Sequence, residues 1–150
     1  MGQISIKNQQ ETVAVDFGRL REVARAVLAG EGKGDGRVGI ALMDNASIHA
    51  LNRRYLDHDE PTDVLSFPLT EPGTRRLEGD LALGAEVAQA QAAARGHDVQ
   101  AELALYVIHG LLHLCGYDDH EDEGRTAMRD RERHYLKLLG LPDIAPRDDE

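Results

Sequence analysis

Residues 98–116 carry the sequence DVQAELALYVIHGLLHLCG, which predicts a long helix. Asp98 is a residue type that accepts hydrogen bonds from the free N–H groups at a helix start, and Gly116 can take the left-handed conformation that ends a helix. The side chains between them are mainly apolar, namely Leu103, Leu105, Val107, Ile108, Leu111, Leu112 and Leu114. His109 and His113 interrupt this apolar surface, so packing alone gives little reason for them.

Shorter elements are predicted on both sides of this helix. Apolar runs and alternation predict strands at 3–7, 37–43, 64–68 and 79–83. Capping residues and apolar periodicity predict further helices at 17–29, 45–55, 86–95 and 123–139. In the helix at 86–95, Val87, Ala90 and Ala94 are expected to form the packing stripe. The mixed order predicts an α+β fold in one domain over 1–150, a small mixed sheet of about four strands packed with four or more helices, with 145–150 a loose tail.

Composition excludes several classes of protein. The 150 residues are 41% hydrophobic and 29% charged, as in ordinary globular domains of this size. A single cysteine, Cys115, excludes an internal disulfide framework and suits a reducing compartment. No apolar run is long enough to cross a membrane, and residues 1–11 lack the apolar core of a signal peptide. We therefore expect a cytoplasmic protein without a membrane partner, and Cys115 is expected to be a core residue.

The charge is strongly acidic and unevenly distributed. The net charge of −10 argues against a chain covered by nucleic acid. Residues 1–76 have a balance of −1 and residues 77–150 a balance of −9, so a polyanion is expected to approach arginines of the first half. The charged run at 121–133 is expected to be a solvated helix face.

His109 and His113 have the spacing of a metal-binding pair. On a helix they are one turn apart and project from the same face. After Gly116 the chain can turn back and deliver a third ligand from 118–120. Three protein ligands and an open position are the composition of a catalytic zinc site. A histidine pair at this spacing is common in proteins that bind no metal there. The further donors in the return loop strengthen the interpretation as a metal site.

Gly110 separates two classes of metal enzyme. In the zinc-protease motif His-Glu-x-x-His, a Glu follows the first histidine and acts as general base. Gly110 occupies that position here, so a metallopeptidase would need its base from elsewhere. A glycine inside a helix costs about 1 kcal/mol relative to alanine, so something must require the missing side chain.

Three blocks of this sequence resemble the YbeY family of metal-dependent endoribonucleases, also called rRNA maturation factors. Residues 109–120 are similar to the family pattern His-Gly-x-Leu-His-Leu-x-Gly-Tyr-Asp-His. Asn52, Tyr55 and Pro61–Pro68 match a second block, and Gly79 with Asp80 matches a third. The order and spacing of the blocks agree over roughly residues 50–140.

The resemblance implies a zinc-type ion held by three residues, with other divalent transition metals possible. It also implies ribosomal RNA as substrate, 3′-end processing of small-subunit rRNA and ribosome quality control. A rival interpretation is a ribosome-associated assembly factor whose metal is structural. An acidic chain without an aromatic base-stacking motif cannot hold RNA strongly by itself. We therefore expect a protein partner, such as a ribosomal protein or an assembly GTPase.

The sequence departs from the family pattern at the third ligand. The family's third histidine falls on Asp119, whereas this chain has its histidine at His120. Either residue type is a sound zinc ligand. His120 is favoured because a surface loop absorbs a shift of one residue easily.

A second departure concerns the substrate side. Leu56 stands where family members usually carry an arginine, so Arg53 or Arg54 is expected to supply the phosphate contact. By the resemblance, Asp63 and Ser66 lie around a strand that lines the cleft. Asp80 is expected to orient backbone or a ligand histidine, a role that suits carboxylates.

Overall fold

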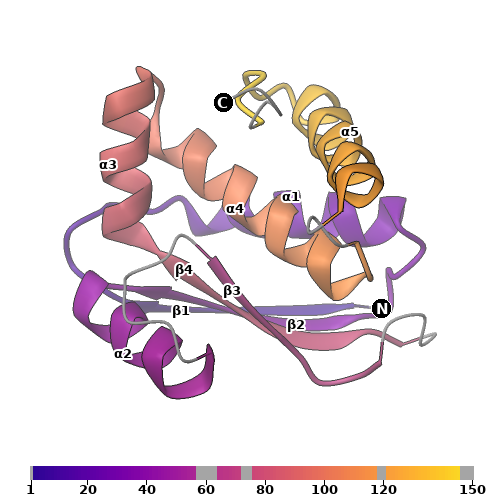
Figure 1. Cartoon of the computed structure of the whole chain (residues 1–150), viewed down its shortest axis with the longest axis horizontal. Helices are drawn as coiled ribbons and strands as arrows, with labels where there is room; N and C mark the ends of the chain where they lie inside the picture. Colours follow the sequence, from indigo (N-terminus) through magenta and orange to yellow (C-terminus); the bar gives the residue numbers. More distant parts are fainter. Residues whose placement is uncertain (1, 57–63, 72–75, 118–120, 146–150) are drawn as a thin grey trace.

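The computed structural model describes residues 2–56, 64–71, 76–117 and 121–145 (Figure 1). In chain order the elements are β1 (Gln3–Gln9), α1 (Phe17–Gly30), β2 (Arg37–Met43), α2 (Asn45–Leu56), β3 (Val64–Pro68), β4 (Glu78–Gly84), α3 (Ala85–Arg95), α4 (Val99–Leu114) and α5 (Asp122–Leu138). Asp16 and Asp98 cap α1 and α4 by accepting backbone hydrogen bonds from Arg19 and Gln100. The predicted elements are therefore all present, with ends that differ by a few residues.

The four strands form one mixed sheet in the order β1-β2-β4-β3. β1, β2 and β4 run parallel, and β3 pairs with β4 in the antiparallel direction. Side chains alternate across the sheet, so that Ile40 and Leu81 face one side while Ala41 and Asp80 face the other. The predicted α+β class and small mixed sheet are confirmed.

Helices cover the two faces of the sheet unequally. α1, α3, α4 and α5 lie on one face, and α2 lies on the other (Figure 1). α4 is the central helix, since it contacts α1, α3, α5, β3 and β4. On the opposite face, Ile48 of α2 packs with Leu65 and Ala82. The main core therefore lies between the sheet and α4, and it holds α4 in place.

At Gly110, α4 approaches the sheet closely. A Cβ atom added at Gly110 would lie 2.7 Å from Leu81 Cδ2 and 3.2 Å from Val64 Cγ2. The first distance would force Leu81 to shift and the second is a tight contact, so the absence of a side chain allows α4 to rest on β3 and β4. Close packing is thus the physical reason for a glycine inside this helix.

Gly110→Ala is expected to lower the free energy of unfolding by about 1–3 kcal/mol, because overpacking at the sheet outweighs the gain in helix propensity. Urea denaturation measures this change. Gly34→Ala is the matched control, since a Cβ there meets nothing within 4 Å. A Gly110→Ala protein as stable as the wild type would contradict the close approach.

Two sequence expectations about packing are wrong. In α3 the buried residues are Ala85, Ala88 and Ala92, whereas Ala90 and Ala94 are exposed. α3 begins directly after β4, so the sheet sets which face of the helix turns inward. Ala145 was expected to begin a loose tail but is buried, being 3% exposed. Residues 146–150 lie outside the described residues.

Candidate metal centre

His109 and His113 lie side by side near the C-terminal end of α4. Their ring centroids are 4.7 Å apart, and the ring planes make an angle of 81°. Their neighbours Ile108 and Leu112 are fully buried, whereas both histidines are partly exposed. The apolar helix thus presents two imidazoles together at a surface that an ion can reach.

The chain turns sharply just after His113. The N–H of Gly116 donates to the carbonyl of His113 at 3.0 Å, and that of Tyr117 to the carbonyl of Leu112 at 3.0 Å. Gly116 has a φ of 105°, a conformation that glycine adopts readily. This turn ends α4, and the predicted return loop at 118–120 stays a prediction because it lies outside the described residues. Asp119 and His120, the two candidate third ligands, lie outside the described residues, within which no three His, Cys, Asp or Glu side chains gather to hold a metal ion.

Glu31, at the end of α1, fixes the start of the return loop. Its Oε1 accepts a hydrogen bond from the Tyr117 hydroxyl at 2.8 Å. Its Oε2 accepts from the Tyr135 hydroxyl at 2.5 Å and from Arg131 Nη2 at 2.6 Å. Burial acts to raise the pKa of Glu31, but the hydrogen bonds from Tyr135, Arg131 and Tyr117 outweigh it and lower that pKa. This cluster, which the sequence did not suggest, ties α1 and α5 to the residue that precedes the candidate third ligands.

A second unpredicted contact comes from α5. Arg129 Nη1 lies 3.5 Å from His109 Nδ1, and Glu132 Oε1 lies 3.7 Å from the same nitrogen. Glu132 is completely buried, so the expectation of a solvated charged face at 121–133 is wrong for this residue. The signal was present in the sequence, because Glu132 falls on the helical stripe of Met128, Tyr135 and Leu136, which are buried.

The remaining predicted site residues lie in different places. The Ser66 hydroxyl donates to the carbonyl of Gly110 at 3.4 Å, so β3 brings Ser66 to the histidine-bearing helix. Arg53 and Arg54 are exposed in the last turn of α2, the helix on the other face of the sheet (Figure 1). Asp63 lies outside the described residues.

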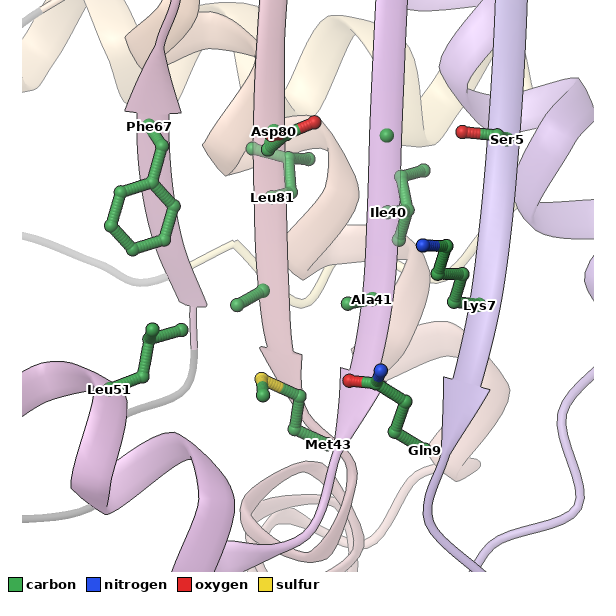
Figure 2. Close-up of a pocket in the computed structure, with 12 residues that line it drawn as sticks. Ser5, Lys7, Gln9, Ile40, Ala41, Met43, Leu51, Phe67, Asp80 and Leu81 are labelled. Carbon is green, nitrogen blue, oxygen red and sulfur yellow. The ribbon is translucent and has the colours of Figure 1, made fainter.

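Asp80 faces away from the histidines. It is exposed on the open face of the sheet and lines a cavity of about 370 Å³ together with Ser5 and Lys7 (Figure 2). A Cβ at Gly39 would lie 2.6 Å from Asp80 Oδ1, so Gly39 makes room for this carboxylate. The sheet therefore separates Asp80 from α4, and the structure does not bring it to the histidine pair.

Cys115 packs against the main core, as expected. Burial, together with the nearby Glu31 charge, raises the pKa of its thiol to about 11.

Comparison with known proteins decides the family. The family model described as Endoribonuclease YbeY matches residues 5–140. This chain belongs to the YbeY endoribonuclease family. YbeY relatives named Endoribonuclease YbeY include one from Carboxydothermus hydrogenoformans, 43% identical, with 91% of this chain and 96% of the relative covered. Another, from Sulfurovum sp., is 41% identical, with 90% of each chain covered.

The YbeY fold is also seen in a solved structure. The solution structure of TM1509 from Thermotoga maritima has a TM-score of 0.66 and 26% identity to this chain, covering 100% of this chain and 99% of TM1509. As a YbeY endoribonuclease, this chain is a hydrolase that acts on RNA. No helix in the described part of the chain is both long and apolar enough to cross a membrane.

Proposed function

We propose that this chain is a zinc-dependent endoribonuclease of rRNA maturation, acting in the cytoplasm at the 3′ end of small-subunit rRNA and in ribosome quality control. The observation that carries the proposal is the pair of partly exposed imidazoles, 4.7 Å apart, on the central helix of a YbeY-family enzyme. Imidazole is a preferred zinc ligand, and two of them on one helix face can hold one ion.

The proposed metal ligands are His109, His113 and a third residue from the return loop, His120 or Asp119. When bound, such an ion supplies Lewis-acid chemistry, because it polarises a phosphate oxygen and lowers the pKa of water towards about 7. Zinc is proposed as the native ion because imidazole ligands suit it. The same ligands also accept other divalent transition metals. His109 and His113 would hold this ion, and they are therefore the proposed catalytic residues.

Of the two candidate third ligands, His120 is expected to matter more. His120→Ala should lose more bound zinc than Asp119→Ala, because an imidazole binds zinc well and the loop can absorb a shift of one residue. Elemental analysis of the purified variants, with protein concentration measured in parallel, gives the ranking. The opposite ranking would assign the third position to Asp119.

Arg53 and Arg54 are the proposed contacts to RNA phosphate. Both are exposed at the end of α2, where their charges are accessible to a polyanion. Because α2 lies on the other face of the sheet from the histidine pair, these contacts are proposed to hold RNA phosphates on that side of the protein. The chain's net charge of −10 opposes RNA binding overall, and a ribosomal protein or assembly GTPase is proposed to deliver the substrate.

The proposal is tested with a labelled RNA that spans the precursor 3′ end of small-subunit rRNA. Zinc-loaded protein, chelator-treated protein and protein reloaded with zinc are compared, with casein as an alternative substrate. Cleavage of the RNA that disappears with chelator and returns with zinc is the expected result. RNA cleavage that survives complete removal of metal would contradict the metal centre. Cleavage of casein alone would favour a metallopeptidase, and metal-independent ribosome binding without cleavage would favour an assembly factor.

A further inference from the structure

We propose that Glu132 is a positioning residue for His109. Its carboxylate holds the imidazole proton on Nδ1, which makes Nε2 the nitrogen that binds the metal ion. This inference rests on the proposed function, because it requires an ion at His109. It assigns a role to α5, which lies outside the histidine-bearing helix and its return loop.

Glu132 stands in an environment that ordinarily excludes a carboxylate. It is completely buried on α5, between Met128 and Tyr135, which are also fully buried. Burying a charge is unfavourable unless that charge is paired. Arg129, one turn earlier and 14% exposed, donates from Nη1 to both carboxylate oxygens of Glu132. A buried ion pair contributes little stability compared with apolar residues, so stability alone does not account for this pair.

The pair is directed at one atom. Glu132 Oε1 lies 3.7 Å from His109 Nδ1, and Arg129 Nη1 lies 3.5 Å from it. Both charged groups therefore approach the Nδ1 edge of the ring. Nδ1 and Nε2 lie on different sides of an imidazole, so a metal ion bound at Nε2 would approach the ring from the side opposite to Glu132.

The chemistry of the two groups distinguishes their roles. A histidine that binds a metal through Nε2 carries its proton on Nδ1, and this proton needs an acceptor. A guanidinium has only donors, so Arg129 cannot accept the proton. Glu132 can, and its Oε1 lies 3.7 Å from Nδ1, slightly beyond hydrogen-bond length. Arg129 holds the carboxylate in place, but alone it would donate to Nδ1 and favour the wrong tautomer.

Three proteins test the role. Glu132→Gln removes the charge and keeps a weaker acceptor. The double variant Arg129→Met with Glu132→Leu replaces the whole pair by apolar residues, a change that buried ion pairs tolerate without loss of fold. Asp130→Asn is the matched control, because it removes an exposed carboxylate of α5 that pairs with Arg133. Zinc affinity is measured by competition with a chromophoric chelator, and the histidine ring nitrogens of zinc-loaded protein are observed by ¹⁵N NMR.

In the wild type we expect zinc on His109 Nε2 and an Nδ1–H proton protected from exchange with water. The double variant should bind zinc about 10–100-fold more weakly, and Glu132→Gln should fall between it and the wild type. The protected Nδ1–H of His109 should be lost in the double variant, while the His113 ring signals stay unchanged. A general loss of stability would not produce that selective change.

The outcomes separate this inference from the proposed function. If zinc does not shift the His109 and His113 ring signals of the wild type, the proposed function fails. If zinc binds the wild type through His109 Nδ1, or if the double variant keeps wild-type zinc affinity, the inference is overturned and the metal centre stands. The wild-type spectrum shows which ring nitrogen of His109 binds zinc, and this observation does not depend on whether a variant folds.

Discussion

His113→Ala is expected to lose tightly bound zinc and to slow RNA cleavage by roughly 1000-fold, since a catalytic ion contributes several kcal/mol of transition-state stabilisation. The side chain is at the accessible end of α4, beside His109, with a centroid distance of 4.7 Å. Its removal leaves a single imidazole on the helix, which cannot hold zinc with one further loop residue. Elemental analysis and the rate of cleavage of the precursor RNA measure the two effects.

His134→Ala is the matched control for His113→Ala. His134 is exposed on α5 and lies edge-on to Tyr135, so removing it takes away one imidazole without touching α4. This control is expected to keep both zinc and activity. Wild-type zinc content and cleavage rate in His113→Ala would contradict the metal centre. Loss of zinc without loss of cleavage would contradict a catalytic role for the metal.

Glu31→Gln is expected to lower the free energy of unfolding by about 3 kcal/mol at neutral pH. The substitution breaks a largely buried ion pair, for which about 3–5 kcal/mol is typical, and partial exposure of Arg131 favours the lower end. Glu31 is 9% exposed and Arg131 is 33% exposed. The hydroxyls of Tyr117 and Tyr135 lose their charged acceptor in the same step. Urea denaturation measures the difference from the wild type.

The contribution of Glu31 should depend on pH in a definite direction. The folded protein lowers the pKa of Glu31 below its ordinary value of 4.5. Its stabilisation is therefore fully present above that value and is lost as the pH falls through the lower folded pKa. The gap in stability between the wild type and Glu31→Gln should shrink below pH 4.5. Glu22→Gln, which changes an exposed carboxylate on the same helix, should show no such gap. A gap that does not change with pH would contradict the role assigned to the Glu31 carboxylate.

Local patterns were sufficient for the elements of the fold. Strands β2 and β3 have the predicted bounds, because short apolar runs between turn residues indicate strands directly. Asp16 and Asp98 cap their helices as predicted, since capping depends on residues only a few positions apart. The proximity of His109 and His113 followed from helical periodicity for the same reason.

Contacts between distant segments could not be read from the sequence. Glu31 meets Tyr117 across 86 positions of the chain, and no local pattern links them. The prediction of which face of α3 packs inward is wrong, because an alanine-rich helix has several equivalent stripes and contact with the sheet selects one of them. Asp80 was expected to orient backbone or a ligand histidine, but strand alternation places it on the other face of the sheet.

The prediction that Glu132 is solvated is the most informative error. The charged run at 121–133 predicts that Glu132 is solvated, although its spacing to Met128 and Leu136 places it on the buried stripe of α5. Periodicity outweighs residue type when a carboxylate has a partner in the core, as Glu132 has in Arg129. Packing also explains Gly110, because Leu81 and Val64 occupy the space that a side chain there would need.

Anomalous diffraction at the zinc absorption edge, from crystals grown with zinc, tests the proposed centre most directly. The expected result is a single strong peak about 2.0–2.1 Å from Nε2 of both His109 and His113, with a third protein ligand from residues 118–120. A zinc peak that contacts neither histidine, or zinc-saturated crystals without a peak at α4, would contradict the assignment of His109 and His113 as the metal-binding pair of this endoribonuclease.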